Sequence, residues 1–234
     1  SIDLSNFDTS KVTKFTNMFS GVTKIKSLDL SKFKTSNVND MSFLFDKCSS
    51  LSSVDLSGFD TAKVTNMKNM FASTKLTSLD LRNFATSNVV DMNSMFFNNY
   101  NLKALDVSSF DTSKVTDMFK MFESCSNVKT LDLKNFRTST VLDMGSMFRN
   151  SYSLESLDLS SFDTSNVRDM FSMFEGDDSL VYLDISSFRT PNVKDMSLMF
   201  YFCKGFTSLD LRNFDASKVT DFSKMFYNNY FIQS

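Results

Sequence analysis

The feature that most constrains this 234-residue chain is an internal repeat of 26 residues. One copy, residues 105–130, reads LDVSSFDTSKVTDMFKMFESCSNVKT, and about nine copies fill the chain. A fixed period of about 20–50 residues is typical of proteins built by stacking one structural unit. The Asp after the first leucine, which is Ile2 or Val54 in two copies, marks each copy, and the intervals between markers are 26 residues except for one of 25. The markers are Asp3, Asp29, Asp55, Asp80, Asp106, Asp132, Asp158, Asp184 and Asp210.

Each copy combines two hydrophobic patterns. Around the marker Asp, as in residues 78–82, polar and apolar residues alternate, which indicates a short strand with one buried face. Further along, apolar residues follow an i, i+3, i+4, i+7 spacing, which indicates one face of a short helix. Asp117 precedes this stripe and is a candidate N-cap, because its carboxylate can accept the free N–H groups of a first turn. In the central copy the stripe consists of Met118, Met121, Phe122 and Cys125.

One copy is too small to bury its own apolar side, so neighbouring copies must supply the core. All 15 Met fall at two positions of the repeat, which the helical template places inside. A Met-rich surface can instead be a binding groove, but no Met here lies outside those core positions. We predict an α/β solenoid of about nine 26-residue repeats, with a parallel β-sheet on one face and short helices on the other. The expected unit is a single repeat domain over residues 1–234, cut from a longer surface protein because neither end resembles a polar cap.

Composition argues against several functional classes. The net charge of −2 gives no electrostatic footprint for nucleic acid or an anionic membrane. No apolar run approaches the length needed to span a bilayer, so we expect no membrane insertion. The chain has no His, which rules out a Cys–His metal site and a His-dependent nucleophile. The many acidic residues belong to repeated rows rather than isolated pairs, so we predict no catalytic residues and a non-enzymatic protein.

The three cysteines occupy one repeat position, three copies apart. Because stacked strands lie about 4.8 Å apart, three copies correspond to roughly 14 Å. A disulfide needs Cα atoms within about 7 Å, so we predict free, buried thiols. A tyrosine near this position in other copies is interpreted as filling the space that a thiol leaves. The cysteines are Cys48, Cys125 and Cys203, and the tyrosines are Tyr100, Tyr152 and Tyr230.

The marker Asp residues would form an outward row about 4.8 Å apart. Like charges at that spacing repel by about 1 kcal/mol per neighbour in a water-like dielectric. Three ways to offset this repulsion stay open: hydrogen bonds from nearby hydroxyls, backbone N–H groups and basic residues; a basic partner laid along the row; or Ca²⁺ bridging successive carboxylates. Calcium needs six or more oxygens, and the repeats lack the Gly-rich loops that supply carbonyls. We therefore predict no cofactor and no metal site, with Ca²⁺ as the remaining alternative.

The repeat resembles the bacterial surface protein 26-residue repeat, the BspA-type class of leucine-rich repeat. The resemblance lies in the motif Leu-x-x-Leu-Asp-Leu-Ser-x-Phe-Asp-Thr-Ser-x-Val-Thr-Asp-Met-x-x-Met-Phe-x-x-Cys and covers essentially the whole chain. Phe110 stands where the common leucine-rich repeat has Asn, so Thr112 and Ser113 are expected to satisfy the backbone of that turn. The resemblance implies a leucine-rich-repeat-like parallel solenoid on secreted or surface-anchored proteins, often adhesins. It supplies no catalytic residues.

Two functions remain open. The first is an extracellular binding module on the cell surface, anchored outside this segment, that holds a protein or glycan of a host or neighbouring cell. The second is a structural spacer that displays another domain. Tyr182 interrupts a run of small residues on the strand face, and an aromatic beside charges resembles an interface anchor, although it could instead only cover its neighbours. An aromatic rim near Tyr152 and Tyr201 is the alternative site. The candidate ligand-binding residues are Asp106, Asp132, Lys134, Asp158, Tyr182 and Asp184.

Overall fold

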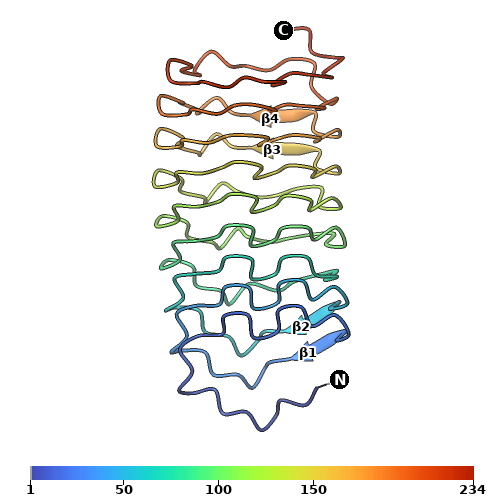
Figure 1. The fold of residues 1–234 in the computed structure, drawn as a ribbon, viewed down its shortest axis with the longest axis vertical. Helices are drawn as coiled ribbons and strands as arrows, with labels where there is room; N and C mark the ends of the chain where they lie inside the picture. Colours follow the sequence, from blue (N-terminus) through green and yellow to red (C-terminus); the bar gives the residue numbers. More distant parts are fainter. Residues whose placement is uncertain (1) are drawn as a thin grey trace.

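The computed structural model describes residues 2–234 and shows coils stacked along one long axis, with the two termini at opposite ends (Figure 1). Each coil is one repeat, numbered here 1 to 9 from the N-terminus and beginning at its marker Asp. The same backbone hydrogen bonds recur between successive pairs of neighbouring coils. The Met118 N–H donates to the Asp143 carbonyl and the Met144 N–H to the Asp169 carbonyl, both at 3.1 Å. The 26-residue period of the sequence is therefore the period of the stack.

Extended structure in the described residues is limited to four three-residue strands and a line of isolated bridges. The strands pair in parallel as two separate two-stranded sheets, β1 with β2 and β3 with β4 (Figure 1). The isolated bridges are also parallel, and all but one of them join the position of Asp117 from coil to coil along the stack; the other joins Thr130 to Ser156. The predicted parallel direction is observed, but the predicted sheet is not continuous along one face. The strands are β1 (Ser27–Asp29), β2 (Ser53–Asp55), β3 (Ser156–Asp158) and β4 (Tyr182–Asp184).

No residue from 2 to 234 is helical, so the predicted α/β solenoid with helices on one face is wrong. The segments predicted as helices are successive tight turns. In coil 5 the N–H groups of Met118, Lys120 and Phe122 donate to carbonyls of coil 6, whereas those of Met121 and Glu123 donate to the carbonyl three residues earlier. Alternate N–H groups thus face the neighbouring coil. An α-helix cannot do this, because all its interior N–H groups bond to its own fourth preceding carbonyl.

Left-handed residues at two positions of each coil produce these turns. In coil 5 they are Lys120 and Ser124, with φ of 58° and 60°. A left-handed L-residue costs roughly 1–2 kcal/mol, so a helix cannot absorb one every four residues. Here the hydrogen bonds to the next coil and the buried side chains between the turns hold the conformation.

Asp117 and its equivalents still accept backbone N–H groups, as the N-cap prediction required, but they open a turn rather than a helix. Asp143 Oδ1 accepts the Gly145 N–H at 2.8 Å, and Asp117 Oδ1 accepts the Phe119 N–H at 2.9 Å. The carboxylates form a half-buried row. Burial raises the pKa of Asp143 to about 6. The negative charges of Asp169 and Asp117 also raise this pKa, whereas the hydrogen bond from the Gly145 N–H lowers it.

The core of the stack consists of side-chain columns that run from coil to coil. The Phe122 ring stacks between Phe96 and Phe148, with centroids 5.8 Å apart on both sides. Fourteen of the 15 Met are buried, Met18 at the N-terminal end being the exception. The prediction that the repeat positions of Met and Phe form the core is confirmed, although turns rather than helices carry them.

The cysteine prediction is confirmed, because all three thiols are free and buried. Burial raises the pKa of Cys48 to about 11 and that of Cys125 to about 12. The interpretation of the tyrosines is wrong. Tyr100 and Tyr152 are 46% and 49% exposed, and the residues before them fill the place of the thiol. Those residues are Asn99, Ser151 and, in coil 9, Asn229.

A ladder of buried threonines joins consecutive coils. The Thr138 hydroxyl donates to the Asp163 carbonyl at 2.9 Å and accepts the Asp163 N–H at 2.8 Å, so one side chain satisfies both backbone groups of the next coil. The same pair of bonds is made by Thr9, Thr35, Thr61, Thr86, Thr112, Thr164 and Thr190. The Thr112 side chain therefore hydrogen-bonds to backbone groups, as expected, but these groups belong to Arg137 of the following coil and not to its own turn.

Thr138→Val is expected to lower the free energy of unfolding by about 1 kcal/mol, because it keeps the shape and leaves the Asp163 N–H and carbonyl without partners in a partly buried place. Urea unfolding followed by circular dichroism measures the difference. The control is Thr116→Val, whose hydroxyl makes one long bond of 3.4 Å to Val90 O. Equal effects of the two substitutions would show that the ladder adds nothing beyond packing.

Candidate functional site

The candidate site is the edge of the stack formed by the marker Asp and the next five residues of each coil, named here the turn face. After the marker the chain reverses in a tight turn, closed in coil 5 by the Phe110 N–H and the Val107 carbonyl at 3.0 Å. The marker carboxylate organises this turn. Asp106 Oδ1 accepts the Ser108 N–H at 3.0 Å and the Ser108 hydroxyl at 2.6 Å. Such a side-chain-to-backbone turn is what Asp favours two residues before a reversal.

The marker carboxylates have partners within their own coils. Hydrogen bonds from Ser108 and Ser160 lower the pKa of Asp106 and Asp158. In coils 4 and 9 an Arg replaces the Ser, and its guanidinium hydrogen bonds lower the pKa of Asp80 and Asp210 to about 2. Of the three ways to offset the repulsion along the Asp row, the structure shows the first: local hydrogen bonds to hydroxyls, backbone and Arg.

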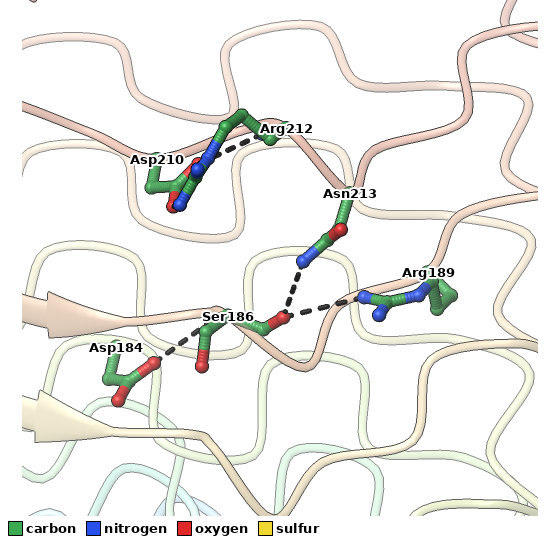
Figure 2. A network of polar contacts seen from close by, with 6 residues as sticks. All are labelled: Asp184, Ser186, Arg189, Asp210, Arg212 and Asn213. Carbon is green, nitrogen blue, oxygen red and sulfur yellow. Dashed lines mark hydrogen bonds and ion pairs between the residues drawn. The ribbon is translucent and has the colours of Figure 1, made fainter.

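Figure 2 shows how neighbouring turns are joined in coils 8 and 9. The Ser186 carbonyl accepts a hydrogen bond from Asn213 Nδ2 at 2.9 Å, and Arg189 Nη1 lies 3.4 Å from the same oxygen. Asp210 and Arg212 form a bidentate pair, with Nη2 to Oδ2 at 2.7 Å. The turn face is thus a surface of ordered polar groups whose carbonyls are partly used within the stack.

Cavities recur at equivalent places along the turn face. The largest, about 680 Å³, spans coils 5 to 7. Others of about 460 Å³ and 360 Å³ lie at coils 3–4 and coils 1–2. The recurrence follows from the repeat, because turn-face residues of neighbouring coils line each of the three cavities. Polar residues lining the largest cavity include Ser108, Asp111, Lys134, Asn135, Arg137 and Asp163.

The structure places the six predicted residues on two adjoining parts of this edge. Lys134 lines the largest cavity, and its N–H donates to Asp132 Oδ1 at 3.2 Å. Asp158 and Asp184 are register partners on β3 and β4. Asp106 belongs to the neighbouring turn of coil 5, and its carboxylate is held by Ser108.

Tyr182 is 55% exposed and stands opposite Ser156 in the β3–β4 pair, beside Asp158 and Asp184. Sequence reasoning did not select Arg137 or Asn135 for the site. The sequence feature that could have identified Arg137 was its place three residues after Lys134, which puts two basic residues in one turn.

The same edge offers no obvious metal site. Among residues 2–234, no group of three or more His, Cys, Asp or Glu side chains is arranged to hold a metal ion. Within those residues there is also no helix long and apolar enough to cross a membrane.

Coils that repeat every 26 residues and bond to their neighbours at equivalent positions define a repeat protein. The chain belongs to the family described as Mycoplasma protein of unknown function, DUF285, whose model matches residues 1–103, 73–181 and 153–234. The three overlapping matches together span the whole chain. No curated protein matches it.

Proposed function

We propose that this chain is a non-enzymatic recognition segment whose turn face binds a protein or a glycan. The observation that carries the proposal is the largest cavity, where Lys134 and Arg137 line one polar hollow. Within the described residues neither side chain forms an ion pair, whereas Arg82 and Arg212 are occupied by Asp80 and Asp210. Two cations without partners beside serine hydroxyls and amides are free to engage a ligand.

The chemistry of the cavity favours a polar, hydroxyl-rich partner. Asp111 and Asp163 line it together with the two bases, and each carboxylate is already held by the N–H of the serine two residues on. A surface that mixes donors, acceptors and both charges suits a glycan or a polar stretch of protein. Because the backbone ladders keep the turns ordered before binding, the protein loses little conformational freedom on association.

The resemblance to BspA-type repeats supports an extracellular setting. We propose that the segment stands on a bacterial cell surface, with its anchor elsewhere, and that its partner lies on a host or neighbouring cell. The kinship with leucine-rich repeats is part of this proposal, since the family match itself describes no function.

A spacer is the second candidate, and the uniformity of the stack favours it. The threonine ladder and the line of parallel bridges run with little change from the first coils to the last. A spacer needs only this regularity, whereas a binding module also needs a distinctive place such as the cavity of coils 5 to 7.

The test is a binding screen against matrix proteins and glycans, followed by affinity measurement with variants. We expect the double substitution Lys134→Ala and Arg137→Ala to raise Kd at least tenfold, or about 1.4 kcal/mol, because it removes both cations of the cavity. The matched control is Lys114→Ala, which removes a base of coil 5 that bonds Asn88 away from the cavity. Added salt should weaken the wild-type complex.

Other outcomes separate the remaining hypotheses. Weakening by Tyr182→Ala or Asp158→Ala alone would place the ligand on β3 and β4 rather than in the cavity. If a ligand responds only to Tyr152→Ala or Tyr201→Ala, the turn face is not the site. If nothing in the screen binds, the spacer function is favoured.

A further inference from the structure

The position 19 residues after the marker Asp is buried in coils 2 to 8 and usually carries a hydrogen-bond donor. In six coils the side chain donates to a phenylalanine carbonyl of the preceding coil, whereas the Thr74 hydroxyl of coil 3 donates to Asn99 Oδ1. We name this position the donor column. Thiol, hydroxyl and amide groups all serve, so the common requirement is a proton on a small side chain. The bonds are Cys48 to Phe19 at 3.0 Å, Asn99 to Phe71 at 2.8 Å, Cys125 to Phe96 at 3.3 Å, Ser151 to Phe122 at 3.1 Å, Cys203 to Phe174 at 2.8 Å and Asn229 to Phe200 at 2.6 Å.

Coil 7 places Asp177 in the donor column, and its side chain is fully buried. Its Oδ1 accepts the Ser151 N–H at 2.8 Å, but its Oδ2 is buried without a partner. The register of the column assigns Phe148 O as the carbonyl of the preceding coil that faces this position. An ionised carboxylate has only acceptors and cannot bond to a carbonyl, whereas a carboxylic acid has one donor.

The charged groups around Asp177 do not compensate a negative charge there. Glu175 and Asp178 of the same coil add negative charge. The two nearby bases are occupied, Arg149 by Glu175 at 2.8 Å and Lys204 by Asp178 at 3.1 Å. On the side of coil 8 the neighbour in the column is the Cys203 thiol and on the side of coil 6 it is Ser151, and both are neutral. Within residues 2–234 no cation forms an ion pair with Asp177.

We propose that Asp177 is kept as the neutral acid and donates a hydrogen bond from Oδ2 to the Phe148 carbonyl, so that the junction of coils 6 and 7 weakens when this proton is lost. The proton passes to solvent, and the carboxylate that remains is buried with one hydrogen bond and no counter-ion. Asp177 thereby supplies the donor that Cys, Ser or Asn supplies elsewhere in the column, but this donor depends on pH. Acid therefore strengthens the junction of coils 6 and 7, and alkali loosens it.

The pKa of Asp177 agrees in direction. Burial raises the pKa of Asp177 well above its usual value, and the charges of Asp178 and Glu175 raise it further. The hydrogen bond from the Ser151 N–H lowers this pKa, but it does not offset the effect of burial. The unfolded chain therefore loses this proton at lower pH than the folded protein. Its contribution to stability is complete below the unfolded pKa of about 3.9 and is lost progressively as pH rises toward the folded pKa.

Asp177→Asn tests the proposal, because an amide can donate as Asn99 and Asn229 do while its oxygen still accepts the Ser151 N–H. Urea unfolding of wild type and variant is compared at several pH values from acid to mildly alkaline. We expect the ratio of their unfolding constants, wild type over variant, to rise up to tenfold per pH unit between the two pKa values of Asp177. Other titrating groups, Asp143 among them, cancel in this ratio.

The matched control is Asp178→Asn, which neutralises the adjacent exposed carboxylate paired with Lys204. Its ratio to wild type should change with pH far less than that of Asp177→Asn, because this variant keeps Asp177 and removes only one of the charges that raise its pKa. A flat ratio for Asp177→Asn overturns the proposal. If that variant does not fold, the assigned ¹³C carboxyl resonance of Asp177 in the wild type decides the matter: titration well above the ordinary range of an aspartate supports the proposal, and titration within that range overturns it.

Discussion

Replacing Phe122 by alanine is expected to lower the free energy of unfolding by about 3–5 kcal/mol. The ring is fully buried, stacks on Phe96 and Phe148 at 5.8 Å, and meets Phe136 at 6.4 Å. Its loss leaves a cavity between three coils, and the surrounding backbone cannot close it because ladder hydrogen bonds fix the coil spacing. Since each coil is stabilised by its neighbours, the defect affects both junctions of coil 5. Urea unfolding monitored by circular dichroism measures the change.

The control for this prediction is Phe231→Ala, which removes a ring that is 58% exposed in coil 9. Surface substitutions of this kind change stability by about 0.5 kcal/mol or less. A loss below about 1 kcal/mol for Phe122→Ala would contradict the continuous phenylalanine column, because a truncated core ring that costs so little is not enclosed on both sides.

The sequence predicted which residues are inside but not the local backbone that puts them there. Met118, Met121, Phe122 and Cys125 fit one face of a helix, yet all four are buried from two consecutive turns. Two turns also bring residues at i, i+3, i+4 and i+7 to one side, so periodicity alone cannot distinguish them. The deciding interaction is the backbone bond to the next coil, which exists only once the repeats stack.

A weaker signal for the turns was present in the sequence. The two left-handed positions of each coil lie four residues apart and are rich in Asn, Ser and Gly, for example Asn69 and Ser73 in coil 3. Asn and Gly tolerate a positive φ better than other residues, so their recurrence disfavours a helix. Phe43 and Leu198 occupy one of these positions with φ of 57° and 58°, however, so stacking overrides local preference there.

The candidate site was predictable in part. The Asp row and its local hydrogen bonds follow from Asp placed two residues before Ser, Lys or Arg in every copy. The cavity does not follow, because residues from the turns of three coils, 5, 6 and 7, line it together. Asp177 likewise stands between Glu175 and Asp178 in the sequence, and only its burial sets it apart from these carboxylates.

Replacing Gly58 by alanine is expected to lower the free energy of unfolding by about 2–3 kcal/mol. Gly58 lies three residues after its marker, in the turn of coil 3, and its backbone approaches coil 2 closely. A Cβ there would overlap Ser31 O and would lie 2.9 Å from Ser31 C and 3.2 Å from Phe33 O. These are backbone atoms of a turn fixed by the Asp29 carboxylate and by the Phe33 N–H bond to Leu30, so they cannot move aside cheaply.

The matched control is Ser109→Ala, at the same repeat position in coil 5, where a Cβ is already present and the side chain is exposed. Its effect should stay within about 0.5 kcal/mol. Both variants are compared with wild type by urea unfolding, and the difference between them isolates the close approach of coils 2 and 3 from any general alanine effect. A Gly58→Ala protein as stable as Ser109→Ala would show that coils 2 and 3 are spaced like the others, because glycine is required there only if the two turns are nearly in contact.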